Sequence, residues 1–251
     1  MLKTRPAFLH GTAVASAALV ALTLSLLPAP VRADQQDHIV FDVTLKGIRA
    51  AELRINGKIV GDGYGANGTL KTTGLIGAIR KLRYDTTVNG HTDGTRFAPM
   101  RYEENADTPS RQSSNTIVYK SGTPVSVAKV PPRPRDDRDL DPRQQNGTVD
   151  PLTALYAVLR DVDRDAACKL NVAIFDGARR SSVQLSQPET SGQMLSCRGE
   201  YRRVAGFSDN DMKEKSRFPF TLTYAPAPNG RLQVVEISTD TVYGKARLKR
   251  Q

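Results

Sequence analysis

The side chains that could do chemistry in this chain are few and widely spaced. Beyond His10, the only imidazoles are His38 and His91. Neither lies near a nucleophile motif, since the sequence has no Gly-x-Ser-x-Gly elbow and no His-Glu-x-x-His pair. Acid–base and nucleophilic catalysis need such groups within hydrogen-bond reach of one another. We therefore predict no catalytic residues and a protein that is not an enzyme, with a hydrolase as the weaker alternative.

A run of acidic residues has the spacing of a calcium loop without its other requirements. Asp137, Asp139 and Asp141 fall on every second position. The sixth position of such a loop is Pro142, where glycine is needed, and the twelfth is Thr148, where a bidentate glutamate belongs. Arginines alternate with the aspartates, so the run is largely self-neutralising. We predict no metal and no cofactor, and we expect residues 131–146 to form an exposed linker loop.

The first 33 residues have the organisation of a cleaved signal peptide. Lys3 and Arg5 form a positive start, an uncharged apolar stretch covers 13–27, and Val31-Arg32-Ala33 is a small-x-small cleavage site. The apolar stretch is too short to span a bilayer comfortably. We expect the mature chain to begin at Asp34, to contain no transmembrane span, and to be exported, with the periplasm of a Gram-negative bacterium as its compartment.

The two cysteines, Cys168 and Cys197, are the only thiols of the chain. An exported compartment is oxidising, and these cysteines lack the Cys-x-x-Cys spacing of a redox pair. We predict that they form an intramolecular disulfide, either between neighbouring strands or at the corner between a helix and a strand.

The charge balance is basic, with a formal net charge of +10. Because the chain is expected to be exported, nucleic acid is excluded as its ordinary partner. The polyanions left are lipid head groups, lipopolysaccharide and cell-wall polymers.

Strand periodicity dominates the chain after the leader. Apolar residues alternate with polar ones from Ile39 to Leu45, again from Ala51 to Ile59, and from Phe218 to Tyr224. Asn-Gly and Asp-Gly pairs mark the turns between such segments. About 12 to 13 sequential antiparallel strands with short connections cannot stay flat. We predict a mainly β single domain over 34–251, either a strongly curved antiparallel sheet or a soluble β-barrel-like fold.

A single amphipathic helix is predicted at about 151–164. Asp150 is a good N-cap and Pro151 suits the first helical position. Apolar residues then recur at helical spacing as Leu152, Leu155, Tyr156, Leu159 and Val162. We expect Leu155 and Leu159 to be buried against the concave face of the sheet.

An outer-membrane barrel would show the same alternation, but the outward faces argue against it. Glu52, Arg54 and Lys58 share one strand face, and Lys245, Arg247 and Lys249 share another. A lipid-facing band does not carry such runs of charge.

Several segments together resemble a known family. They are FDVTLKGIRAAELRINGKI from Phe41, DPLTALYAVLR from Asp150, CKLNVAIFDGARRSSVQL from Cys168, CRGEYRRVAGFS from Cys197 and the closing FPFTLTYAP and LQVVEISTDTVYGKARL. This pattern is similar to the bacterial domain-of-unknown-function family 3108, found in exported proteobacterial proteins. The resemblance implies a β-rich exported fold in a Gram-negative periplasm, and it brings no catalytic residues.

The leading functional hypothesis is an envelope-supporting binding protein that holds an apolar ligand such as a lipid chain. Inward-facing residues would line its cavity, and basic residues would bind the anionic head at the rim. The cavity candidates are Phe41, Leu53, Tyr84, Phe220 and Leu222. The rim candidates are Arg202 and Arg203, because arginine pairs bidentately with phosphate or carboxylate. The alternative is a surface scaffold that binds cell-wall polymer or a protein partner, with a packed interior.

Overall fold

The computed structural model describes residues 1–2, 34–241 and 244–251. The predicted leader, 1–33, therefore lies almost wholly outside the described residues. The strands are β1 (Gln35–Leu45), β2 (Ile48–Val60), β3 (Gly63–Thr72), β4 (Arg83–Thr92), β5 (Phe97–Thr108), β6 (Arg111–Lys120), β7 (Thr123–Val130), β8 (Thr148–Val149), β9 (Asn171–Phe175), β10 (Arg180–Ser191), β11 (Met194–Ala205), β12 (Arg217–Pro226), β13 (Leu232–Thr241) and β14 (Gly244–Arg250). The helices are α1 (Gly74–Ile79), α2 (Pro151–Leu159), α3 (Asp209–Glu214) and the 3-10 turn η1 (Pro142–Gln144).

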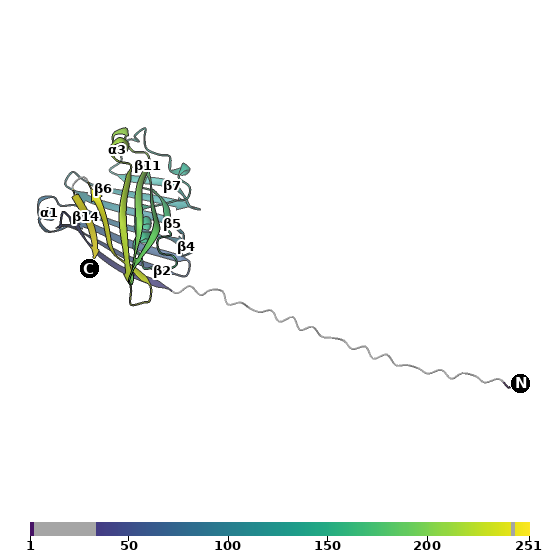
Figure 1. The fold of residues 1–251 in the computed structure, drawn as a ribbon. Helices are drawn as coiled ribbons and strands as arrows, with labels where there is room; N and C mark the ends of the chain where they lie inside the picture. Colours follow the sequence, from purple (N-terminus) through teal and green to yellow (C-terminus); the bar gives the residue numbers. More distant parts are fainter. Residues whose placement is uncertain (3–33, 242–243) are drawn as a thin grey trace. The chain divides into compact units, whose positions relative to one another are not determined.

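All of these strands belong to one sheet, in the order β7-β6-β5-β4-β3-β2-β1-β14-β13-β12-β11-β10-β9-β8. Neighbours are antiparallel except for the short β8–β9 pair. The sheet curls until the C-terminal strands cross in front of the N-terminal ones (Figure 1). The prediction of a mainly β, strongly curved, barrel-like fold is confirmed.

The seam between the two edge strands is closed by connecting segments. Asn115 Nδ2 donates to the carbonyl of Asp176 over 3.0 Å, and the amide of Gly147 donates to the carbonyl of Gly122 over 2.9 Å. Leu140 joins the same seam through its amide, which donates to Ala178 over 2.8 Å. Segment 131–146 is mostly exposed, but Leu140 packs on the core and Gln145 is buried. This segment therefore helps to close the barrel.

The strand directions give the barrel two distinct ends. The turns after β2, β4, β6, β10 and β12 lie at one end, which we call the closed end. The turns after β1, β3, β5, β9 and β11 lie at the other, which we call the open end. Every inward side chain can be assigned to a level between these ends, because side chains alternate between the two faces of a strand.

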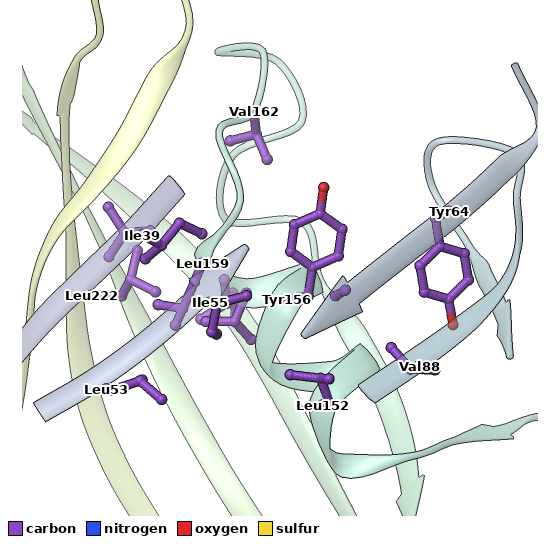
Figure 2. Close-up of a cluster of buried hydrophobic side chains, with 14 of the residues drawn as sticks. Ile39, Leu53, Ile55, Tyr64, Val88, Leu152, Tyr156, Leu159, Val162 and Leu222 are labelled. Atoms are coloured by element: carbon purple, nitrogen blue, oxygen red, sulfur yellow. The ribbon is translucent and has the colours of Figure 1, made fainter. Parts of the chain in front are cut away.

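Helix α2 fills the interior toward the closed end. Leu152, Tyr156 and Leu159 are each at most 3% exposed. Figure 2 shows Leu159 among Ile39, Leu53, Ile55 and Leu222, and Leu152 and Tyr156 facing Tyr64 and Val88. The helix is thus packed on nearly all sides, and only Pro151 and Leu155 are partly exposed. Leu155 packs on the core without being fully buried.

Glycines let the helix approach the strands closely. A Cβ at Gly57 of β2 would lie 2.1 Å from Tyr156 Cε2, and one at Gly68 of β3 would lie 2.9 Å from Leu152 Cδ1. Both distances are too short for a side chain. These inward positions are glycine because the helix occupies the space that their side chains would take.

The helix is shorter than the predicted 151–164, and it is one of three α-helices in the described part of the chain. It ends at Leu159, because the backbone of Val162 pairs with Leu232 of β13 through hydrogen bonds of 2.9 and 2.8 Å. A residue that joins a β ladder cannot continue the helix. Helix α3 begins at a capping box in which Ser208 and Asp211 bind each other's backbone amides. That Ser-x-x-Asp signal was present in the sequence.

Candidate ligand site

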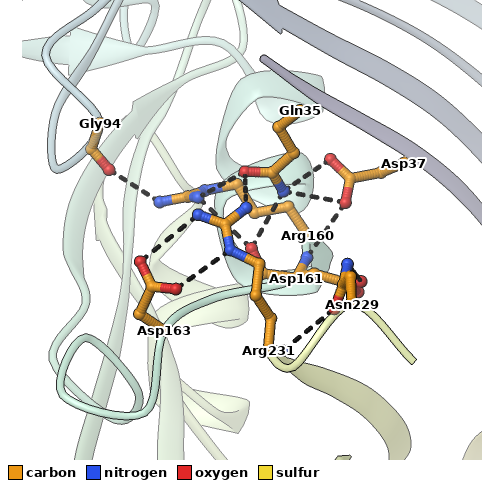
Figure 3. Close-up of polar contacts among 8 residues, drawn as sticks. All are labelled: Gln35, Asp37, Gly94, Arg160, Asp161, Asp163, Asn229 and Arg231. Atoms are coloured by element: carbon orange, nitrogen blue, oxygen red, sulfur yellow. Dashed lines mark hydrogen bonds and ion pairs between the residues drawn. The ribbon is translucent and has the colours of Figure 1, made fainter. Parts of the chain in front are cut away.

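A buried polar network seals the closed end (Figure 3). Asp37 of β1 accepts hydrogen bonds from Tyr156 Oη at 2.6 Å and from Gln35 Nε2 at 2.9 Å. The guanidinium of Arg160 donates to the carbonyl of Gly94 over 2.7 Å and stands over the Phe97 ring at 5.5 Å. Burial lowers the pKa of Arg160. The network joins β1, α2 and the β4–β5 turn.

The same network reaches the β12–β13 turn. Asn229 Nδ2 donates to Asp161 Oδ2 over 3.1 Å, and Arg231 Nε donates to Asp163 Oδ1 over 3.1 Å. Arg250 of β14 lies 3.6 Å from Asp161 Oδ1. Because Asp37, Asp161 and Asp163 each face a polar or charged partner, this network is a structural seal of the closed end.

A second buried acid lies at the start of α2. Asp150 is fully buried, and burial raises its pKa to about 6 although Thr153 donates to both carboxylate oxygens. Tyr64 Oη lies 2.7 Å from the Thr153 hydroxyl. Burial also raises the pKa of Tyr64, Tyr102 and Tyr119. These tyrosines stay protonated in the folded protein at neutral pH.

The open half of the barrel is lined differently. Its inward positions carry apolar side chains that are only partly buried, although the alternation of the strands points them at the interior. Across neighbouring strands, Val43 pairs with Leu248, Leu248 with Ile237, and Ile237 with Leu222. In the N-terminal strands, Leu53 pairs with Leu70, and Leu70 pairs with Tyr84. The partly buried members of this open apolar wall are Val43, Leu70, Tyr84, Val183, Phe220, Ile237 and Leu248.

A polar cleft of about 520 Å³ adjoins the seam at the open end. Three of its side chains form a row across β5, β6 and β7, because Glu104 pairs with Asn115 and Asn115 pairs with Lys129. Tyr102 donates to Glu104 over 2.8 Å. Asn115 Oδ1 is buried and has no hydrogen-bond donor among the described residues. The row therefore places the unsatisfied Asn115 Oδ1 on the strand position next to the Lys129 amine.

Some of the charges around the cleft are paired. Arg133 contacts Asp139 at 2.8 Å, and Arg138 is paired with Asp136. Lys129 differs, because no salt bridge of the described residues includes it. Burial and the nearby Arg133 lower its pKa. Lys129, Arg111 and Arg179 are thus the cations of the cleft lining that no salt bridge of the described residues neutralises.

The predicted cavity residues divide between the two halves. Phe41, Leu53 and Leu222 lie in the packed core and are at most 7% exposed. Tyr84 and Phe220 lie in the open half and are partly exposed. The structure therefore places Tyr84 and Phe220 where a ligand could touch them, and the other three beneath that surface.

The predicted rim residues point in opposite directions. Arg202 is exposed on the outer face, whereas Arg203 points inward at the open end. The Arg203 guanidinium lies over Phe207 at 5.4 Å and Phe218 at 5.1 Å, and it donates to the carbonyl of Asp211 over 2.6 Å. Arg203 thus holds α3 in place at the rim.

The predicted disulfide is present. Cys168 and Cys197 are bonded, with their Cα atoms 5.4 Å apart. Cys168 lies between α2 and β9, and Cys197 lies in β11, so the bond ties the segment that follows the helix to the barrel wall.

Lys129, Asn115 and Glu104 were not singled out by the sequence reading. A Ser-x-x-Lys spacing at Ser126 and Lys129 was one local signal. The structure separates those two side chains, because residues three apart on a strand face opposite ways. What brings Lys129 into the cleft is strand pairing, which only the three-dimensional register reveals.

Among the described residues, no cluster of three or more His, Cys, Asp or Glu side chains could hold a metal ion. Within the same residues, no helix has the length and apolar character needed to cross a bilayer.

Comparisons with known proteins give a family and no activity. No curated protein matches the chain. A solved structure described as a β-barrel-like protein of domain of unknown function DUF1849 from Brucella abortus is similar, with 16% identity and a TM-score of 0.49 over 86% of this chain and 95% of that one. The family described as "Protein of unknown function (DUF3108)" matches residues 40–249, which is most of the sequence. The chain belongs to the DUF3108 family.

Proposed function

We propose that this protein is an exported, periplasmic binding protein, not an enzyme, that holds an acyl chain in the open half of its barrel. The observation that carries the proposal is the open apolar wall, whose side chains point inward and yet are only partly buried. Inward apolar surface that the protein itself does not cover is the usual lining of a site for an apolar ligand.

The polar cleft supplies a place for the ligand's head. Ser113 of β6 lines the cleft and pairs with Ala106, which in turn pairs with Tyr84 of the open apolar wall. Lys129 and Asn115 lie at this same edge. An acyl chain along the wall would bring its carboxylate or phosphate toward the Lys129 amine. The disulfide is consistent with an oxidising compartment.

The proposal is tested by native mass spectrometry of protein purified from the periplasm, followed by titration of the delipidated protein with a fluorescent fatty acid. The wild type should carry lipid and bind the probe. Phe220→Arg or Leu248→Arg should weaken binding at least about tenfold, because each places a charge in the apolar wall. Lys129→Met should weaken binding of the fatty acid more than binding of its uncharged methyl ester.

The matched control is Val204→Arg, which puts the same charge on an exposed position of the outer face. It should leave probe binding unchanged. Near-ultraviolet circular dichroism checks that each variant is folded. Wild-type protein that carries no lipid and does not bind the probe would overturn the proposal in favour of a scaffold that acts through its outer surface.

A further inference from the structure

The open end carries an exposed apolar tip, formed by Ile48, Ile76 and Ile79. Their exposed fractions are 55%, 38% and 85%, and Ile79 is among the most exposed large apolar side chains of the described chain. Ile76 and Ile79 belong to α1, in the β3–β4 connection, and Ile48 begins β2, which α1 contacts. Isolated exposed apolar residues are ordinary, but three aliphatic side chains on two neighbouring connections mark a contact surface.

The tip is held in place without burying its isoleucines. The amide of Thr73 donates to the carbonyl of Ala50 over 3.0 Å, which ties the start of α1 to β2. The Thr72 hydroxyl donates to the carbonyl of Arg80 over 3.0 Å, and the amide of Leu82 donates back to that hydroxyl over 3.0 Å. The backbone is therefore fixed by polar contacts, and the isoleucines are left free to meet another surface.

Unpaired cations surround the tip. Lys46 stands in the β1–β2 turn, and Arg80 and Lys81 directly follow α1, which itself contains no acidic residue. Among the described residues, no salt bridge includes Lys46, Arg80 or Lys81. The nearby Arg49 differs, because Asp42 at 2.5 Å and Glu52 at 3.1 Å neutralise it. The acid of the adjoining strand, Asp85, is likewise bound to Arg83.

We propose that this tip docks the protein onto an anionic bilayer surface. Ile76 and Ile79 enter the head-group layer, while Lys46, Arg80 and Lys81 pair with lipid phosphates. An aliphatic tip without aromatic or hydrogen-bonding side chains, ringed by cations, complements phospholipid better than a protein surface. The inference rests on the exposure and charge of the tip and not on the proposed acyl-chain site. Docking would nevertheless turn the open end toward the membrane.

The test is flotation of the mature protein, residues 34–251, with vesicles. One set contains phosphatidylglycerol with phosphatidylethanolamine, and the other contains phosphatidylcholine alone. The wild type should bind the anionic vesicles and lose binding as salt rises. Ile76→Asp with Ile79→Asp should reduce binding at least about tenfold, and Arg80→Glu with Lys81→Glu should do the same, since each cation contributes about fivefold at such a surface.

The matched control is Val60→Asp, which changes a side chain of comparable exposure, 47%, at the closed end of the same barrel. It should float as the wild type does. Wild-type protein that fails to bind anionic vesicles would overturn the inference, as would equal losses from Val60→Asp and Ile79→Asp. Self-association without vesicles that Ile79→Asp abolishes would show instead that the tip is a protein contact.

Titration with the fluorescent fatty acid separates this inference from the proposed function. Ile76→Asp with Ile79→Asp should bind the probe as the wild type does, because neither side chain belongs to the open apolar wall. If this variant lost both probe binding and flotation, the two activities would not depend on separate residues, contrary to the assignment of docking to the tip and of fatty-acid binding to the open apolar wall.

Discussion

The closed and open ends of this barrel are built from the same strands, but they differ in how completely their inward side chains are buried. At the closed end, α2 fills the interior, glycines make room for it, and a polar network covers its last turn. At the open end, side chains at inward positions keep part of their surface exposed. The closed end is therefore the more completely buried of the two.

The largest expected effect breaks the packing of the closed end. Gly57→Ala places a methyl group 2.1 Å from Tyr156 Cε2, so the ring must shift and its hydrogen bond to Asp37 must weaken. Overpacking together with an impaired buried hydrogen bond should cost about 4 kcal/mol of unfolding free energy. The measurement is urea denaturation. Gly65→Ala, which meets only the carbonyl of Val88 at 3.7 Å, is the control and should cost under about 1 kcal/mol.

The two ends can be compared directly within α2. Leu159→Ala removes a fully buried side chain and should cost about 2 to 5 kcal/mol. Leu155→Ala removes a partly exposed one and should cost less than half as much as Leu159→Ala. Equal shifts of the denaturation midpoint would show that the two ends are packed alike.

The disulfide should stabilise the closed end by constraining the segment after α2. It closes a loop with a sequence separation of 29. Cys168→Ala with Cys197→Ala should lower stability by about 3 to 4 kcal/mol. Reducing agent should lower the wild-type midpoint toward that of the variant and leave the variant unchanged. Binding of the fatty-acid probe should persist wherever the protein remains folded.

Asp150 gives the closed end a pH dependence. Its folded pKa of about 6 lies above the unfolded value of about 3.9. Between these values the folded state binds more protons, so stability should fall as pH rises from about 4 to 6, by up to about 3 kcal/mol, and then level off.

Asp150→Asn checks this assignment, because asparagine keeps the N-cap and does not titrate. The difference in unfolding free energy between the wild type and the variant should change across that window of pH and be constant above it. A difference that is independent of pH from 4 to 7 would contradict it.

The sequence predicts the strands and the start of the central helix better than it predicts which inward side chains are buried. Alternation places β1, β2 and β12, and the Asp150-Pro151 signal places the start of α2. Helical spacing extended the helix too far, because the pairing of Val162 with Leu232 is a long-range contact that local pattern does not contain. The division of Phe41 from Phe220 could not be predicted either. Both are inward and aromatic, yet Phe41 is fully buried and Phe220 is only partly buried.

The pairing of β1 with β14 has a consequence for how the chain folds. Val43 lies opposite Leu248, so the first described strand pairs with the last. The other described strand pairs join segments that lie close together in the chain, and can form as soon as those segments have emerged. The N-terminal and C-terminal runs of strands can unite only once the final strand is available. Closing so long a loop is slow. Until then, β1 is paired only with β2 and has one unpaired edge.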